Sequence, residues 1–180
     1  MARTTNTAAP GCRVQMSLRR PKAGMTGHVH LYRAKCSWAG STGVGYSNYG
    51  RAHEMVAPPS RDRLRLSADP AFFGDAQLMN PESLVLAAAS SCQMLSFLAA
   101  AARARVDVVA YEDDAEAVMP EDVRPVRITE IRLRPRITAR SPATQRRILA
   151  LSAVAHRECY VANTLSCEIL LAPEVEILDS

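Results

Sequence analysis

The chain has 180 residues, 48% of them hydrophobic and 22% charged, and a formal net charge of +4. This composition is ordinary for a soluble globular protein, and the length favours one domain with a core of its own. Residues 1–30 hold five basic residues and no acid, and removing these five from the 22 basic residues leaves 17 against 18 acidic ones. Because the rest of the chain has no basic excess, we expect no nucleic-acid-binding surface.

Cysteine usage indicates the redox compartment. The chain has five cysteines, an odd number, and no CxxC pair that would suggest a zinc site. The sequence shows no signal peptide, so we expect a reducing cytoplasm in which thiols are free or catalytic. Three of the five are expected to be passive: Cys12, Cys36 and Cys167.

Residues 1–24 lack hydrophobic periodicity, and we expect them to form a disordered extension before a single domain at residues 25–180. Alternation of apolar and polar residues over 29–38 predicts a first strand. A Gly-rich turn then leads into a second strand at 46–56, and a short third strand is predicted at 63–66.

The stretch from Asn80 to Arg105 predicts the central helix. Asn80 is a suitable cap, Pro81 suits the first helical position, and Glu82 is an acid in the first turn. About 20 uncharged residues follow, apolar on every side of the helix, which is typical of a buried helix or a membrane span. We expect a buried helix and no membrane partner, because the stretch is rich in Ala and Ser and no other segment resembles it.

After this helix, strands are predicted at residues 106–119 and 126–138, paired antiparallel with one solvent-exposed face. Pro135 lies within the second of them and favours an edge position. A second helix is expected to begin at Ser141-Pro142 and to end near Cys159, and a last strand to cover 165–178. The predicted fold class is α+β, with two helices packed on antiparallel sheet.

Three arginines alternate along the predicted strand 126–138, at positions 132, 134 and 136. Three cations on one strand face could form an anion site. A solvated face is the interpretation that we favour.

Cys92 lies in the middle of the central helix among small residues, which is explained either by tight helix packing or by a reactive thiol. A reactive thiol needs a neighbour that stabilises the thiolate, and a permanently charged guanidinium suits this role. Arg51, after the Gly-rich turn, is the candidate, and Glu82 could orient it. Other arginines remain alternatives to Arg51, namely Arg61, Arg63 and Arg65.

Two cysteine motifs together resemble the OsmC/Ohr family of osmotically induced and organic hydroperoxide resistance proteins. The first is NPESLVLAAASSC, with Cys92 ten residues after Glu82. The second comprises Ala155, His156, Cys159 and a run that ends at Leu165. Trp38 and Gly40 are similar to the Trp-x-Gly of the first hairpin of this family, and the resemblance spans about residues 28–178.

The resemblance implies an OsmC-like fold, with antiparallel sheets wrapped around a long central helix, in an intertwined homodimer with active sites at the subunit interface. It implies a cysteine-based thiol peroxidase that uses no metal or organic cofactor. Cys92 would be the peroxidatic and Cys159 the resolving cysteine, with Arg51 the catalytic arginine and Glu82 its partner. The substrate would be an organic hydroperoxide, and an external dithiol would reduce the Cys92–Cys159 disulfide.

Apolar side chains are expected to favour organic hydroperoxides, namely Met94, Leu95 and Phe97, with Phe72 and Phe73 as further candidates. Ten residues of straight helix place Glu82 about 15 Å from Cys92. The site therefore needs a long reach by Arg51, a break in the helix or a partner subunit, and we expect the partner subunit. Two other functions remain open for a pocket around Cys92: binding of an apolar ligand by a non-catalytic protein, and redox sensing.

Overall fold

The computed structural model describes residues 27–179, so the extension predicted for residues 1–24 and its Cys12 lie outside the described residues. The chain from Ala34 onward forms one compact unit, which holds all helices and strands of the described part. The domain bounds 25–180 stay a prediction.

The first sheet has three short antiparallel strands in the order β1-β2-β3: β1 (Lys35–Ser37), β2 (His53–Val56) and β3 (Arg63–Leu66). The third strand was predicted with these bounds, but the first two are shorter than expected. Val29 and Leu31 supplied the alternation of the first predicted strand, yet their side chains are 54% and 69% exposed and have no strand beside them. Alternation alone does not form a strand without a partner.

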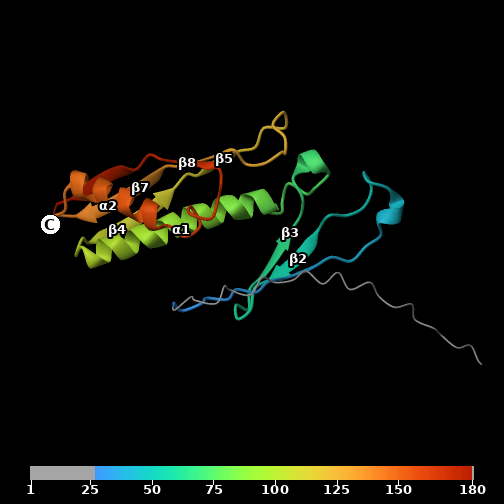
Figure 1. The fold of residues 1–180 in the computed structure, drawn as a ribbon, viewed down its shortest axis with the longest axis horizontal. Coiled ribbons are helices and arrows are strands. Elements are labelled where there is room, and N and C mark those ends of the chain that lie inside the picture. The colour runs from blue at the N-terminus through green and yellow to red at the C-terminus, as the bar shows by residue number, and fades with distance from the viewer. Residues whose placement is uncertain (1–26, 180) are drawn as a thin grey trace, which may run out of the picture. The chain divides into compact units, whose positions relative to one another are not determined.

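The predicted central helix is confirmed as α1 (Pro81–Arg103). The Asn80 side chain accepts a hydrogen bond from the backbone N–H of Ser83 at 2.8 Å, and Pro81 occupies the first turn with Glu82. Figure 1 shows α1 as one continuous helix. The helix ends where Arg105 adopts a left-handed conformation with φ of 57°.

Only one face of α1 is buried within the protomer, which corrects the expectation of a fully buried helix. Its length and composition would also suit a membrane span, but the core helix of a folded domain meets the same criteria. Only 28% of the most apolar 18-residue stretch of α1 is buried. Leu95, outside the buried face, is 60% exposed. The buried face is formed by Ala89, Gln93, Phe97, Ala100 and Ala101.

Each of the three long strands predicted after α1 is divided into two. The six resulting strands are β4 (Val108–Asp113), β5 (Glu116–Val118), β6 (Glu130–Leu133), β7 (Pro135–Arg140), β8 (Glu168–Leu171) and β9 (Glu174–Leu178). They form two three-stranded sheets in the orders β4-β7-β9 and β5-β6-β8. The predicted antiparallel pairing holds for β4 with β7 and for β5 with β6, whereas β8 and β9 pair in parallel with β6 and β7.

The edge position expected from Pro135 is wrong, because β7 is the central strand of its sheet. Pro135 is the first residue of β7, where a missing N–H is tolerated in a sheet. It follows Arg134, which lies between β6 and β7.

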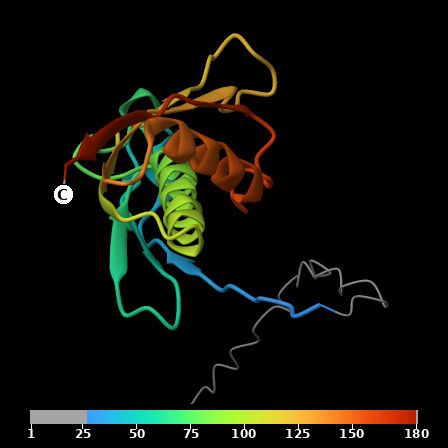
Figure 2. The ribbon, with the colours of Figure 1, turned by 90° about the vertical axis from the view of Figure 1, so that its left-hand side faces the viewer.

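The second helix, α2 (Gln145–Glu158), begins later than predicted. Thr144 caps it by accepting a hydrogen bond from the N–H of Arg147. The helix lies against α1 and β9, and α1 also contacts β4 (Figures 1 and 2). The core between them is formed by Phe97, Ala101, Val106, Ile137, Ala139, Ile148 and Ala155. A second cluster, formed by Ala89, Ile131 and Leu133, lies under the sheet β5-β6-β8.

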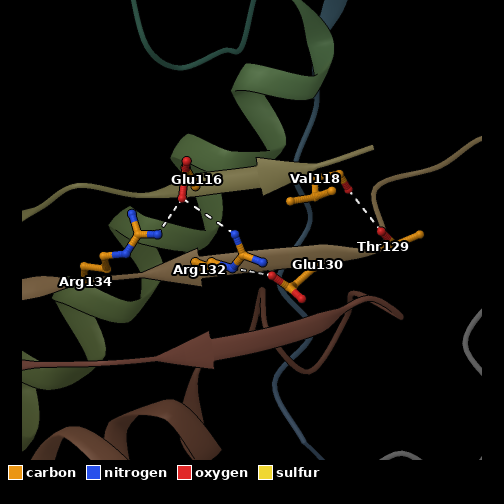
Figure 3. A network of polar contacts seen from close by, with 6 residues as sticks. All are labelled: Glu116, Val118, Thr129, Glu130, Arg132 and Arg134. Atoms are coloured by element: carbon orange, nitrogen blue, oxygen red, sulfur yellow. Dashed lines mark hydrogen bonds and ion pairs between the residues drawn. The ribbon is translucent and has the colours of Figure 1, made fainter. Parts of the chain in front are cut away.

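The arginine-bearing strand face is a solvated face, as expected. Glu116 pairs with Arg134 at 2.5 Å and with Arg132 at 3.9 Å, and Arg132 also pairs with Glu130 (Figure 3). Arg136 pairs with two further acids on the neighbouring chain segment. Since these cations already face carboxylates, an anion site on this face is not indicated.

Candidate active site

Cys92 lies near the middle of α1, at the edge of its buried face, and is half-buried. Its sulfur accepts a hydrogen bond from the backbone N–H of Val161, with an N to S distance of 3.5 Å. Val161 belongs to the turn that follows α2, 69 residues further along the chain. The fold therefore brings the two cysteine motifs into direct contact.

Cys159 ends α2 and begins this turn, and its side chain is 1% exposed. Its sulfur accepts a hydrogen bond from the N–H of Ala162 at 3.5 Å, and the Asn163 side chain donates to its carbonyl at 3.0 Å. These hydrogen bonds stabilise the turn next to the Cys159 thiol. Cys159 is also close enough to form a side-chain hydrogen bond with Cys92.

The surroundings separate the pKa values of the two thiols. Burial by itself raises the pKa of Cys92, but hydrogen bonds from Cys159, from the N–H of Val161 and from Ser96 outweigh it and bring this pKa below its ordinary value. Burial raises the pKa of Cys159, and its hydrogen bond to Cys92 raises it further. Cys92 is therefore the favoured thiolate, and Cys159 is the thiol that donates to it.

Cys92 opens into a pocket of about 700 Å³, called here the thiol pocket. One wall follows a single face of α1, from Ala88 past Leu95 to Arg103. The opposite wall comes from the end of α2 and the turn, with Tyr160 and Asn163. The pocket is open to solvent within the protomer and is lined mainly by small and apolar groups close to the sulfur.

Arg51 lies in the loop before β2, not within a strand as predicted. Its guanidinium carbon lies over three aromatic rings, 4.1 Å from the centroid of Tyr49, 5.1 Å from that of Tyr46 and 5.3 Å from that of Phe73. The two terminal nitrogens donate to the carbonyls of Tyr49 and Tyr46, at 2.9 and 2.6 Å. Aromatic faces attract a cation, and no ion pair in the described part of the chain involves Arg51.

Backbone contacts hold the arginine loop and the aromatic rings in place. Trp38 donates from its indole nitrogen to the carbonyl of Gly50, beside Arg51, at 2.7 Å. Phe73 has a φ of 61°, unusual for a residue with a side chain. The following Gly74 is needed because a Cβ there would lie 1.7 Å from the carbonyl oxygen of Ala68.

Glu82 and Arg51 line one pocket of about 460 Å³, called here the arginine pocket. Trp38, Tyr46, Tyr49 and Phe72 supply its aromatic walls. The prediction that Glu82 pairs with Arg51 is not met within this protomer: among the ion pairs of residues 27–179, none joins the two side chains.

Within one protomer the structure does not bring Arg51 and Glu82 to Cys92, because the thiol pocket and the arginine pocket share no residue. The helix between Glu82 and Cys92 is unbroken, so a break cannot close the distance of about 15 Å. Arg51 is held among its aromatic neighbours and does not reach along the helix. The structure therefore does not support a break in the helix or a long reach by Arg51, and the expected contribution by a second subunit stays a prediction.

Other side chains considered from the sequence lie outside the immediate surroundings of the thiols, with one exception. Arg63, an alternative to Arg51, is exposed and pairs with Glu54 at 2.5 Å. Phe97 is fully buried in the core, so it cannot line a substrate pocket as expected, whereas Leu95 does line the thiol pocket. Met94 belongs to a separate small hollow beside Asp113.

Several groups around the site were not singled out from the sequence. Tyr46 and Tyr49 were assigned only to a hairpin, although an aromatic pair beside a lone arginine is a usable signal. The N–H of Val161 carries no signal, because any residue supplies one. Gln93 could have been noticed as the one amide in an apolar run. Within residues 27–179, no cluster of three His, Cys, Asp or Glu side chains is placed to hold a metal ion.

A family model described as OsmC-like protein matches residues 74–173, which include α1, α2, Cys92 and Cys159. The structure of an OsmC-like protein of unknown function from Vibrio cholerae is 26% identical and has a TM-score of 0.71. That match covers 83% of this chain and 100% of the Vibrio chain.

Two further solved structures share the fold at lower identity. An organic hydroperoxide resistance protein from Elizabethkingia anophelis, with thiocyanate bound, is 16% identical with a TM-score of 0.64 and covers 84% of this chain and 99% of that one. An organic hydroperoxide resistance protein OsmC from Legionella pneumophila is 17% identical with a TM-score of 0.58 and covers 83% and 99%. No curated protein matches the chain in sequence.

Proposed function

The chain belongs to the family of OsmC-like proteins, and from this premise we propose that it is a cysteine-based thiol peroxidase that reduces organic hydroperoxides. The observation that carries the proposal is the placement of Cys92 in an open pocket, beside the turn that begins at the buried Cys159, with the pKa of Cys92 lowered and that of Cys159 raised. The names of similar structures as organic hydroperoxide resistance proteins support the choice of substrate.

The proposed reaction balances on these two residues. The Cys92 thiolate attacks the outer oxygen of the hydroperoxide, an S–O bond forms, the O–O bond breaks, and the alcohol leaves with a proton. The Cys159 sulfur then attacks the sulfur of the Cys92 sulfenic acid. The S–S bond forms, the S–O bond breaks, and hydroxide leaves with the Cys159 proton as water. An external dithiol reduces the disulfide and becomes oxidised itself.

We further propose that a homodimer completes the site, with Arg51 and Glu82 supplied by the second subunit. The exposed apolar face of α1 supports this assembly, because Leu95 is 60% exposed and lies among the small side chains of Ala88 and Ala99. A guanidinium without an acidic partner would meet the Cys92 thiolate across such an interface. Arg51 would stabilise the thiolate and orient the peroxide oxygen.

The proposed setting is a reducing cytoplasm. Four cysteines lie in the described part of the chain, and all four are free thiols. Free thiols of this kind persist where glutathione and thioredoxin keep cysteines reduced. The same compartment would supply the external dithiol.

The test is a steady-state assay with cumene hydroperoxide and dithiothreitol. Cys92→Ser is expected to abolish peroxide consumption, because it removes the only atom that accepts oxygen. Cys159→Ser is expected to slow turnover strongly while dimedone labels the Cys92 sulfenic acid. Cys167→Ser, at a free thiol that lines neither the thiol pocket nor the arginine pocket, is the matched control and should keep the wild-type rate.

Three outcomes would contradict this proposal. Full turnover by Cys92→Ser would end the catalytic assignment of this residue. Oxidation of Cys92 once per chain with no turnover under excess dithiol would indicate a redox sensor. Absence of any sulfenic acid would indicate a binding protein that uses the same pocket for an apolar ligand.

A further inference from the structure

Gln93 is the polar residue in the otherwise apolar buried face of α1. Ala89, Gln93 and Phe97 follow at intervals of four residues and lie on one side of the helix. Ala89 belongs to the cluster under β6, and Phe97 belongs to the core under α2. The fully buried amide of Gln93, 0% exposed, lies where these two apolar clusters meet.

The amide makes one hydrogen bond, and it is to the other helix. Its Nε2 donates to the backbone carbonyl of Ser152 on α2, at 3.3 Å. Its Oε1 has no hydrogen-bond partner among the described residues, and neither has the buried hydroxyl of Ser152. A buried polar atom without a partner lowers the stability of a fold.

An apolar side chain of similar shape would fill this position at lower cost. Loss of one partner of a buried hydrogen bond is costly only where the other is left unsatisfied, and the Ser152 carbonyl lies inside α2, where the helix supplies a donor of its own. Stability therefore does not explain the amide at this place. Buried polar groups do, however, fix one relative placement of packed elements, because an apolar contact tolerates sliding and a hydrogen bond does not.

The bonded residues lie close along the chain to both thiols. Gln93 is the residue after Cys92, and Ser152 is seven residues, or about two helical turns, before Cys159. Ser152 and Ala155 are buried on one face of α2, and Cys159, which caps the end of this helix, is buried as well. The bond from Gln93 to Ser152 consequently fixes where α1 meets α2, and with it the position of one sulfur relative to the other.

We propose that Gln93 is a positioning residue for the formation of the Cys92–Cys159 disulfide. In that step the Cys159 sulfur attacks the Cys92 sulfenic acid opposite its hydroxyl group, so both distance and direction matter. The first step, attack of Cys92 on peroxide, needs no such alignment of the helices. This inference rests on the proposed function, since it assumes that Cys92 becomes a sulfenic acid.

The experiment compares the two steps in Gln93→Met and in the wild type after one equivalent of cumene hydroperoxide. Sulfenic acid formation is followed by dimedone capture in the Cys159→Ser background, and disulfide formation by the loss of free thiols with Cys159 present. We expect sulfenic acid formation to stay within about twofold of the wild type. Disulfide formation should slow by at least about tenfold, as expected for a misplaced reacting group. The thermal midpoint of Gln93→Met should equal or exceed that of the wild type.

Two further variants control the comparison. Gln93→Asn keeps an amide that is too short to reach Ser152, so it should also form the disulfide slowly. Leu98→Met changes another α1 side chain packed against the core and should keep the wild-type rates. Disulfide formation by Gln93→Met within twofold of the wild type would overturn the inference and leave the proposed function intact. A wild type that forms no sulfenic acid would overturn both.

Discussion

The backbone N–H of Val161 points at the sulfur of Cys92 from 3.5 Å, in a turn that begins at Cys159. The reduced protein thus places the turn that begins at Cys159 directly against the Cys92 thiol. The same contact makes each thiol part of the electrostatic surroundings of the other.

Replacing Cys159 by Ala should raise the pKa of Cys92. Burial, the largest influence, raises this pKa and remains in the variant, while the hydrogen bond from Cys159, the largest influence that lowers it, is lost. At a fixed pH below the pKa, less thiolate is present, so alkylation of Cys92 becomes slower. The measurement is the iodoacetamide rate at the Cys92 peptide against pH, whose midpoint should move to higher pH. Cys167→Ala is the control, because this thiol lines neither pocket, and an unmoved midpoint in Cys159→Ala would contradict the assignment.

Local signals were sufficient to predict α1 and its boundaries. Asn80, Pro81 and Glu82 act through the chain immediately around them, so the sequence shows the helix start directly. The OsmC-like fold expected from the two cysteine motifs is confirmed.

Features that depend on distant partners were not predictable in the same way. The long predicted strands divide because their halves pair in different sheets, and β8 and β9 pair in parallel with strands more than 30 residues away. The aromatic surroundings of Arg51 include Phe73, which is 22 residues further along the chain. The protomer also exposes one face of α1, which was predicted to be buried because the run is apolar on every side.

Ile131→Ala should destabilise the fold without touching either thiol. Ile131 is 0% exposed and packs with Ala89 and Leu133 beneath the sheet β5-β6-β8. Its truncation leaves a cavity, and the expected loss in free energy of unfolding is about 2–5 kcal/mol. Urea denaturation measures it, and Val118→Ala on the exposed part of β5 serves as the control, with a much smaller loss. A negligible effect of Ile131→Ala would be incompatible with a close-packed cluster beneath this sheet.

Leu95→Glu should convert the proposed dimer to a monomer. The side chain is 60% exposed on the apolar face of α1, and a carboxylate buried in an interface without a partner is strongly unfavourable. Light scattering after size-exclusion chromatography reports the mass. Leu149→Glu is the matched control, because Leu149 is exposed on α2, and it should remain dimeric. A wild-type chain that is monomeric at micromolar concentration would remove the basis of this prediction.

Mixing two inactive variants tests whether the site is shared between subunits. Arg51→Gln retains Cys92, and Cys92→Ser retains Arg51. If Arg51 acts on Cys92 of the partner subunit, the mixed dimer contains one intact site and one that lacks both groups. Random exchange gives half mixed dimers, each with one of two sites, so activity should recover to about one quarter of the wild type.

The two alternatives give different results in the same experiment. If Arg51 served Cys92 of its own subunit, no subunit in the mixed dimer would hold both groups, and peroxidase activity would stay at the level of the inactive variants. The doubly substituted Arg51→Gln, Cys92→Ser chain mixed with Arg51→Gln is the control, because no combination of these chains restores a site. Recovery in the first mixture and none in the control would show that the arginine pocket of one protomer meets the thiol pocket of the other. Such a result would account for the separation of the two pockets within a protomer.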